Sequence, residues 1–383
     1  MPHGRAPSFV SRRGSTPGPL LIRHPLTLWG PRSAVIRSNS QGVTIEVQSD
    51  GVSLLGFTVD GSGDRPDLTD AAVRIRGSDV RVEGLRIVNA LFGLTVEQSR
   101  RVALVGNEII GDPATPVGLR GDGIRLWETR DSLVSRNLLD HSRDLLIWYS
   151  PDNRVIGNIV RQSRYGTHMM YSSGGLIEAN RYIGNVVSVF IMYSRNMRVR
   201  HNLLAANAAE GMGLGAKDSG NLVVTDNRFV KNNMGLYLDS SPFGRDETNV
   251  VRGNLFALCD AAVVFHSSQI HNTFAGNTFR DNQAQVRVEG RGDAMGVTWT
   301  GNYFDDYAGY DFDRDGFGDV PYEPRSLSNQ LLGVRPELAF FQGTSALSLL
   351  EMVGRVFPLY QPTPVLVDEA PRMEPPVAEG DAS

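Results

Sequence analysis

The sequence is poor in features that would anchor a protein in a membrane or hold a small secreted domain together. It has a single cysteine, Cys259, which excludes an internal disulfide framework and leaves the redox compartment open. No run of about 18 apolar residues occurs, so no transmembrane helix is expected. The formal net charge of -4 gives no basic footprint for nucleic acid, and we expect no nucleic-acid partner.

Aromatic residues are also scarce, at 8%, whereas glycine is abundant, with 41 among 383 residues. This composition favours many tight turns over packed helices. A chain of this length is long for one compact core, but a solenoid escapes that limit because each repeat contacts only its neighbours.

Asparagine marks the repeat. A small or polar residue, then Asn, then alternating apolar residues recur with a period near 23, at Asn107, Asn137, Asn158, Asn180, Asn202, Asn227, Asn254, Asn277 and Asn302. A second polar column follows five residues later, at Ser142, Ser163, Asn185, Asn207, Asn232, Cys259 and Asn282. Asparagine suits a coil corner because it accepts left-handed backbone geometry and its amide can bond along a stack.

The period and the strand-like alternation predict an all-β fold, a right-handed parallel β-helix, over residues 20–304. We expect residues 1–19 to be a disordered or mis-started N-terminus, 305–369 an acidic loop and capping segment, and 370–383 a disordered, acidic, Pro-rich tail. Within the capping segment, 345–357 predicts an amphipathic helix that covers the open end of the solenoid. Cys259 is interpreted as a small structural filler.

A recurrent serine at the end of a strand separates the two faces of the coil. It is placed at Ser150, Ser172, Ser194, Ser219, Ser240 and Ser267. Residues three and five positions earlier carry no charge and are assigned inward. The opposite face is outward and rich in large apolar side chains, which indicates either a partner surface or a cover by another segment. Its candidate partner-binding residues are Trp127, Trp148, Phe190 and Lys217.

The same outward face holds a candidate copper site. His168 and Met170 lie two apart on one strand, and Met192 takes the Met170 position one coil later, roughly 4.8 Å away. An imidazole and two thioethers suit Cu(I), a soft ion, although Met and His are also ordinary packing residues.

A second candidate metal site follows the repeat. Asp311, Asp313, Asp315 and Asp319, with Gly316 at the turn, could converge on one Ca²⁺ ion. Tyr322 stands where an EF-hand needs Glu, so the loop is not an EF-hand. A solvated acidic turn without metal is the alternative.

No nucleotide-binding loop or catalytic triad motif is visible. The acid/base candidates Asp122, Asp144, Arg143 and Arg164 look scattered among the columns. Two other functions stay open: a carbohydrate-active β-helix enzyme (lyase, hydrolase or epimerase) acting on an acidic polysaccharide, and a purely structural solenoid. A stacked acid/base cluster in one groove would favour the enzyme.

Several motifs together carry a family resemblance. RYGTHMMYS (164–172), VFIMYSRN (189–196), GMGLGAKDS (211–219) and GNYFDDYAGYDFDRDGFGDVPYEP (301–324) resemble the NosD family, from about Gly18 to Pro371. These are periplasmic accessory proteins for the maturation of nitrous oxide reductase. Phe304 departs from the Trp that is usual in the last motif.

The resemblance implies a non-enzymatic, copper-binding role in the periplasm. It implies an ABC transporter, made of a permease and an ATPase, a copper chaperone lipoprotein and nitrous oxide reductase as partners. It also implies that His168, Met170 and Met192 lie where the family concentrates its Met and His residues. No signal peptide is visible in this reading frame, so we expect an exported protein whose frame is short at its 5′ end.

Overall fold

The computed structural model describes residues 8–10, 14–207, 211–267, 270–289, 292–325 and 364–376, and single residues at 338, 344 and 349. The chain divides into two compact units, residues 1–198 and 199–383. Each unit is built from short parallel strands in three sheets, which we call A, B and C, and this confirms the predicted parallel β-helix. Over the described part of the chain, no helix is long and apolar enough to cross a membrane.

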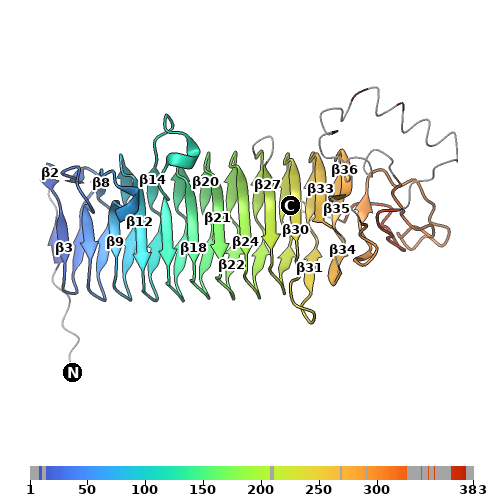
Figure 1. Ribbon diagram of the computed structural model, residues 1–383, viewed down its shortest axis with the longest axis horizontal. Coiled ribbons are helices and arrows are strands. Elements are labelled where there is room, and N and C mark those ends of the chain that lie inside the picture. Colours follow the sequence, from blue (N-terminus) through green and yellow to red (C-terminus); the bar gives the residue numbers. More distant parts are fainter. Residues whose placement is uncertain are drawn as a thin grey trace. The chain divides into compact units, whose positions relative to one another are not determined.

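Each coil of the first unit contributes one strand to each sheet, and the strands run in the same direction (Figure 1). Sheet A contains β1 (Ser8–Val10), β4 (Thr27–Trp29), β7 (Ser53–Leu55), β10 (Arg81–Glu83), β13 (Ala103–Val105), β16 (Leu133–Ser135), β19 (Arg154–Ile156) and β22 (Leu176–Glu178). Sheet B contains β2 (Gly14–Pro17), β5 (Ala34–Arg37), β8 (Thr58–Asp60), β11 (Arg86–Val88), β14 (Glu108–Ile110), β17 (Leu138–Asp140), β20 (Ile159–Arg161) and β23 (Arg181–Ile183). Sheet C contains β3 (Leu20–Ile22), β6 (Ile45–Val47), β9 (Ala71–Ile75), β12 (Phe92–Glu97), β15 (Ile124–Trp127), β18 (Asp144–Trp148), β21 (Tyr165–Met170) and β24 (Val187–Met192).

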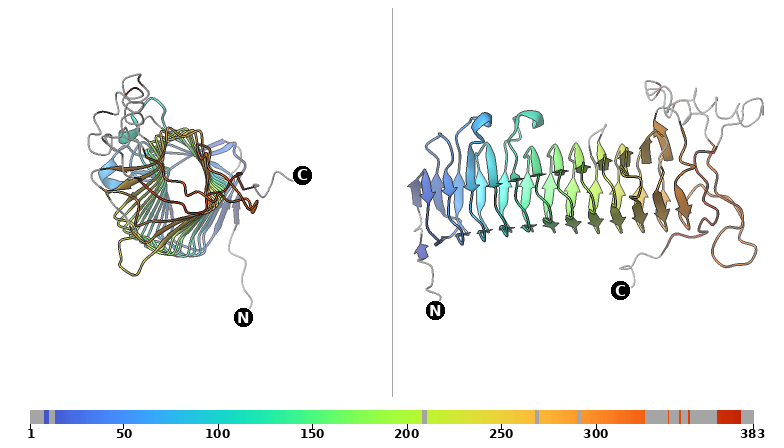
Figure 2. Two further views of the ribbon diagram at one scale, coloured as in Figure 1. Left: turned by 90° about the vertical axis from the view of Figure 1, so that its right-hand side faces the viewer. Right: turned by 60° about the horizontal axis from the view of Figure 1, so that its bottom comes forward.

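Two longer turns of the first unit carry short 3-10 helices, η1 (Pro66–Leu68) and η2 (Val117–Leu119), which project on the same side of the coils (Figure 2). Strands β1 and β2 pair with β4 and β5, so regular structure begins before residue 20 and the expected boundary there is too late.

The second unit repeats the three-sheet pattern. β25 (Arg198–Arg200) spans the division between the units. Sheet A continues in β28 (Val223–Thr225), β31 (Asn249–Arg252), β34 (Asn272–Ala275) and β37 (Thr298–Thr300). Sheet B has β26 (Leu203–Ala205), β29 (Arg228–Val230), β32 (Leu255–Ala257), β35 (Thr278–Arg280) and β38 (Tyr303–Phe304), and sheet C has β27 (Met212–Lys217), β30 (Met234–Asp239), β33 (Ala261–His266) and β36 (Ala284–Glu289).

The asparagine column forms a hydrogen-bonded ladder inside each unit. Asn158 Nδ2 donates to Asn180 Oδ1 at 2.9 Å and to the Val134 carbonyl at 2.9 Å, while its own Oδ1 accepts the Asn137 backbone N–H at 2.9 Å. In the second unit, Asn202 donates to Asn227 in the same way, at 2.9 Å. Each buried amide is therefore fully used, which explains why asparagine occupies the corner in most coils.

Cys259 replaces a residue of the second polar column, as the sequence predicts. Its backbone N–H donates to Asn282 Oδ1 at 3.0 Å, and its side chain is buried. Burial raises the pKa of the thiol to about 11, which fits a filler and not a reactive nucleophile.

Residues 364–376 close the second unit. The Asp368 carboxylate accepts the Asn302 backbone N–H at 3.0 Å and Asn302 Nδ2 at 2.8 Å, and so ends the asparagine ladder. Arg372 lies over the Phe317 ring at 4.9 Å and donates its backbone N–H to the Asn302 carbonyl. The prediction that the tail is disordered from residue 370 onward is therefore wrong for residues 370–376. The expected helix at 345–357 lies outside the described residues.

One register assignment needs correction. Lys217 pairs with Asp239, and Ser241, not Ser240, donates to the Ser219 carbonyl at 2.8 Å. The serine column thus shifts by one residue, so Tyr237 lies on the outward face instead of the inward one. No residue is added here, because Ser241 follows Ser219 by the same 22 residues that separate Ser150, Ser172 and Ser194. Ser240, with φ of 47°, takes the left-handed place that Asp218 takes before Ser219.

Candidate functional site

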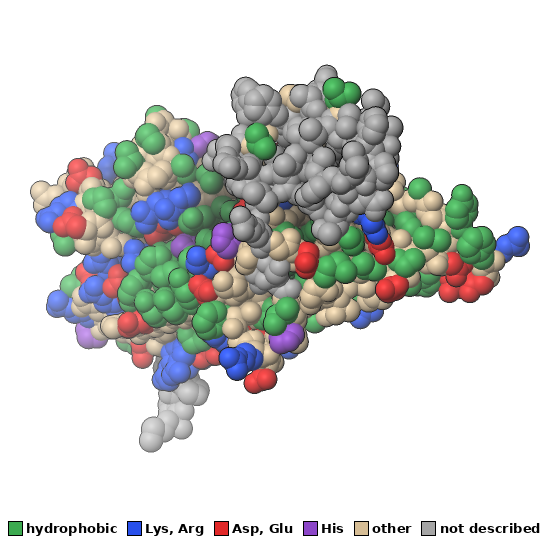
Figure 3. All heavy atoms as spheres, turned by 45° about the vertical axis from the view of Figure 1, so that its right-hand side comes forward, with side chains coloured by type: hydrophobic (Ala, Val, Ile, Leu, Met, Phe, Trp, Pro, Cys, Tyr) green, Lys and Arg blue, Asp and Glu red, His purple; other side chains and the backbone are tan. Residues whose placement is uncertain are grey.

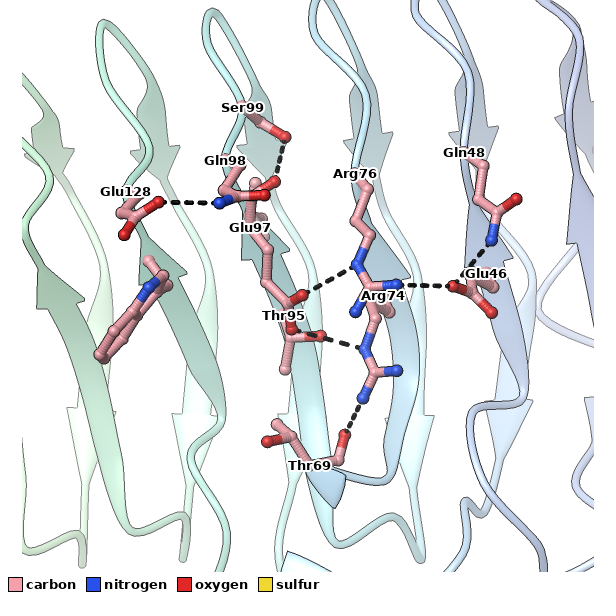
Figure 4. A network of polar contacts seen from close by, with 12 residues as sticks. Glu46, Gln48, Thr69, Arg74, Arg76, Thr95, Glu97, Gln98, Ser99 and Glu128 are labelled. Carbon is pink, nitrogen blue, oxygen red and sulfur yellow. Dashed lines mark hydrogen bonds and ion pairs between the residues drawn. The ribbon is translucent and has the colours of Figure 1, made fainter. Parts of the chain in front are cut away.

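The outward face of sheet C in the first unit begins as a ladder of charges. Arg76 bonds to Glu97 at 3.0 Å and to Glu46 at 3.4 Å, and Arg74 lies 3.5 Å from Glu97 (Figure 4). Glu and Arg thus alternate across β6, β9 and β12. These partly exposed pairs contribute little stability, but they compensate each other's charge and leave this part of the face polar.

From β15 onward the same face becomes aromatic and sulfur-rich. Trp127 pairs with Trp148, with ring centroids 5.7 Å apart, and Met170 pairs with Met192 across β21 and β24. All four side chains are half-buried. The structure therefore brings the two predicted thioethers into direct register on neighbouring strands.

His168 lies on the same face, two residues before Met170, and opposite Phe190 on β24. It is 6% exposed, packed against Trp148 at 5.8 Å and Tyr165 at 4.7 Å between ring centroids. Both ring nitrogens are buried, and neither has a hydrogen-bond partner in the described structure. The imidazole therefore lacks hydrogen bonds at both nitrogens. Leaving a buried polar group unpaired costs roughly 1–3 kcal/mol.

The Tyr-Gly-x-His motif has a local structural reason. Thr167 points inward and its hydroxyl bonds to the Tyr182 hydroxyl at 2.8 Å. A Cβ on Gly166 would lie 2.4 Å from Tyr182 Cδ1, so only glycine leaves room for the buried tyrosine. The strand alternation then places His168 outward.

A ladder of buried carboxylates and arginines borders His168, which corrects the expectation that these residues are scattered. Arg143 Nε donates to Asp122 Oδ1 at 2.9 Å, and Arg164 forms two hydrogen bonds to Asp144, one of them at 3.0 Å. Each arginine reaches back to the aspartate of the preceding coil. A β-bulge between β18 and β21 shifts the register, so counting back from the serine column misaligns the residues.

The two carboxylates have opposite electrostatic environments, although both are fully buried. Burial raises the pKa of Asp122, and Arg143 offsets this only in part. Burial acts in the same direction on Asp144, but His168 and Arg164 outweigh it and lower the pKa of Asp144. Asp144 is therefore the carboxylate of this pair whose ionised form the surroundings favour more.

A tyrosine ladder flanks the Met and Trp residues, and the sequence reasoning missed it. Tyr149, Tyr171 and Tyr193 stack with centroid distances of 5.1 and 4.8 Å, and Tyr149 also contacts Trp127 at 5.4 Å. Tyr149 is 46% exposed and Tyr171 44%. The signal was a Tyr directly before three successive column serines, Ser150, Ser172 and Ser194. On the face of the molecule drawn in Figure 3, hydrophobic side chains gather in a patch among charged ones.

The other predicted partner residue, Lys217, belongs to the second unit. It ends β27, and its Nζ lies 2.9 Å from Asp239 on β30. The side chain is 39% exposed, so its ion pair is open to solvent.

The acidic loop brings three of its four predicted ligands together. Carboxylate oxygens of Asp311, Asp313 and Asp315 lie within 4.8 Å of one another. Asp319 instead accepts the Phe312 backbone N–H at 2.6 Å. Although the Asp315 backbone N–H favours the ionised form of Asp313, burial and the repulsion of its acidic neighbours together raise its pKa.

Comparison with known proteins identifies the family to which the chain belongs. The family model for the periplasmic copper-binding protein (NosD) matches residues 105–309. A protein of Pseudomonas aeruginosa named probable ABC transporter binding protein NosD is 28% identical over 405 residues, covering 96% of this chain and 88% of the relative. One of the same name from Stutzerimonas stutzeri is 28% identical over 380 residues, covering 95% and 86%.

The A-module of the mannuronan C-5 epimerase AlgE6 of Azotobacter vinelandii is similar in structure. Its TM-score is 0.61 with 13% sequence identity, over 78% of this chain and 90% of the module. At this identity the likeness concerns the fold alone.

Proposed function

Because the chain belongs to the NosD family of periplasmic copper-binding proteins, we propose that it is a periplasmic accessory protein that handles Cu(I) for the copper–sulfide centre of nitrous oxide reductase. Relatives that it matches over 95% or more of its length are named for binding an ABC transporter. The proposed partners are the permease and ATPase of such a transporter, a copper chaperone lipoprotein and the reductase.

The pairing of Met170 with Met192 beside His168 carries the proposal. Two thioethers and one imidazole are a soft donor set, which suits Cu(I) and no hard ion. Neither ring nitrogen of His168 has a hydrogen-bond partner, so a nitrogen lone pair is available to bind a metal ion. The cargo would meet these groups on one face of two adjacent strands.

Burial divides the roles of the three donors. Met170 and Met192 are half-buried and can be reached from solvent, whereas His168 lies beneath Tyr165 and Trp148. We therefore assign the thioethers to the first encounter with Cu(I) and the imidazole to the inner position. Handover to a partner would run in the reverse order.

The aromatic side chains around this site suit transient docking. Trp127, Trp148 and Phe190 are half-buried, and Tyr149 and Tyr171 are exposed next to them. Tyr and Trp dominate protein interfaces because they bury a large area at a low entropic cost. A partner that delivers or takes copper would contact this surface while the metal changes ligands.

Competition for Cu(I) against a chromophoric chelator tests the site. The variant His168→Ala/Met170→Leu/Met192→Leu should lose Cu(I) affinity with its circular dichroism unchanged. The second unit offers a matched control, since Met212 and Met234 also pair across neighbouring strands of sheet C and are half-buried. The Met212→Leu/Met234→Leu variant should bind Cu(I) as the wild type does. Equal affinity in all three proteins would rule the site out.

A second candidate function, a polysaccharide-modifying enzyme, is favoured by one observation. Asp122 and Asp144 stack with Arg143 and Arg164 on neighbouring coils, as an acid/base cluster would. Both carboxylates are fully buried and paired, however, so a polymer cannot reach them in this conformation. Incubation with a polyuronic acid, followed by chain-length and epimer analysis by NMR, should show no change, whereas any turnover lost in Asp144→Asn would establish the enzyme.

A further inference from the structure

Asp144 is held in one position beside His168. Its Oδ1 accepts Arg164 Nε–H at 3.0 Å and the Tyr165 backbone N–H at 3.3 Å, while its Oδ2 also bonds to Arg164. With the guanidinium and the backbone fixing the carboxylate, its Oδ2 has one direction left in which to accept a proton donor. In that direction lies Nδ1 of His168, 3.8 Å away.

The distance between His168 Nδ1 and Asp144 Oδ2 is compatible with a metal site to which no metal is bound. At 3.8 Å the atoms do not hydrogen-bond, and Nε2 of His168 is unpartnered as well. A small rotation of the imidazole would bring Nδ1–H onto Asp144 Oδ2 and free the Nε2 lone pair for a metal ion. Both nitrogens would then be satisfied at once, as in the carboxylate–histidine–metal arrangement that fixes the tautomer and raises the basicity of a ligating histidine.

We propose that Asp144 is a positioning residue for copper, which holds His168 in the Nδ1–H tautomer so that Nε2 can bind the ion. The proposal rests on the copper site proposed above and adds a residue to its mechanism. Arg164 takes part indirectly, because it fixes the carboxylate and leaves Oδ2 directed at the ring.

Asp144→Asn should reverse the tautomer. The Oδ1 position receives two N–H donors, so the amide oxygen must take that place and the NH₂ group must face His168. An NH₂ group can only donate to Nδ1, which moves the ring proton to Nε2 and blocks the metal-binding nitrogen. The fold should persist, because the amide keeps the shape and most hydrogen bonds of the carboxylate.

Asp122 provides the matched control. It is equally buried and bonds to Arg143 of the following coil, but its carboxylate contacts Arg143 and Arg125 instead of His168. Asp122→Asn therefore removes a buried, arginine-paired charge without touching the ring.

Two readouts on the full chain test the proposal. Long-range ¹H–¹⁵N spectra of metal-free, ¹⁵N-histidine-labelled protein report the tautomer, with His168 assigned from His168→Gln. We expect Nδ1–H in the wild type and Asp122→Asn, and Nε2–H in Asp144→Asn. In chelator competition, Asp144→Asn should bind Cu(I) about tenfold to a hundredfold more weakly, and Asp122→Asn within about twofold of wild type.

The outcomes separate this proposal from the one on which it rests. An Nε2–H tautomer in the wild type overturns the role of Asp144 even if Asp144→Asn fails to fold. Unchanged affinity in Asp144→Asn, with loss in His168→Gln, overturns it while leaving the copper site intact. Unchanged affinity in His168→Gln overturns the copper site and this role together.

Discussion

Met170 and Met192 pair directly across β21 and β24, and Trp148 stands opposite Met170 on the other neighbouring strand, β18. Trp148, Met170 and Met192 thus occupy the same outward position on three consecutive strands, with an indole on the first and a thioether on each of the next two. An ion held between them would be bound by both at once, with little rearrangement of either strand.

Removing either thioether should therefore weaken Cu(I) binding. We expect Met170→Leu and Met192→Leu each to lower the affinity about tenfold, or ~1.4 kcal/mol, with the double variant close to the weaker single one, because one ion uses both sulfurs. Leucine conserves volume, so the fold should be kept. Chelator competition measures this, and independent, fully additive losses would contradict a shared ion.

The asparagine ladder predicts a large stability effect at one position. Asn158→Ala leaves the buried Asn137 backbone N–H and the Val134 carbonyl without their partners, and should cost about 2–4 kcal/mol. Asn39 is exposed, and Asn39→Ala should change stability by less than ~0.5 kcal/mol. Urea denaturation followed by circular dichroism compares the two, and equal midpoints would refute the role of the ladder.

The opposite pKa shifts of Asp144 and Asp122 predict opposite pH behaviour. The lowered pKa of Asp144 means that its charge stabilises the fold fully above the ordinary Asp value of about 3.9, and that this is lost as pH falls through the folded-state pKa. Asp144→Asn should thus be destabilised at neutral pH, by about 3 kcal/mol, and less so in acid.

For Asp122 the sign is reversed, because a raised pKa means that ionisation costs stability as pH rises through it. Asp122→Asn should lose much less than Asp144→Asn at neutral pH. Urea midpoints measured across the acid range test both, and identical pH profiles for the two variants would show that the pairings are equivalent.

For the acidic loop we propose Ca²⁺ binding by Asp311, Asp313 and Asp315. The ion would relieve the repulsion among the three carboxylates, so millimolar Ca²⁺ should raise the melting temperature relative to chelator. Since the pKa of Asp313 is raised, protons should compete for the site early as pH falls. Asp319→Asn should keep the shift and Asp313→Asn should lose it, whereas no shift in the wild type would leave a plain acidic turn.

The sequence was sufficient for features that repeat in every coil. The asparagine column gave the period, and period-2 alternation put His168, Met170 and Met192 on the outward face. It was insufficient where one residue is added to a coil or where two adjacent residues fit the same column. The bulge after Asp144 hid its stacking with its neighbours. Ser240 and Ser241 both fit the serine column, and only the strand pairing identifies Ser241 and places Tyr237 on the outward face. Both features become visible only when strands are paired in space.

X-ray absorption at the copper edge tests the central claim most directly. The full chain loaded with one equivalent of Cu(I) should show one imidazole nitrogen and two thioether sulfurs around the metal. The sulfur contribution should disappear in Met170→Leu/Met192→Leu and persist in Met212→Leu/Met234→Leu. A spectrum without sulfur, or with a sulfur contribution that survives the loss of Met170 and Met192, would contradict copper binding at this site.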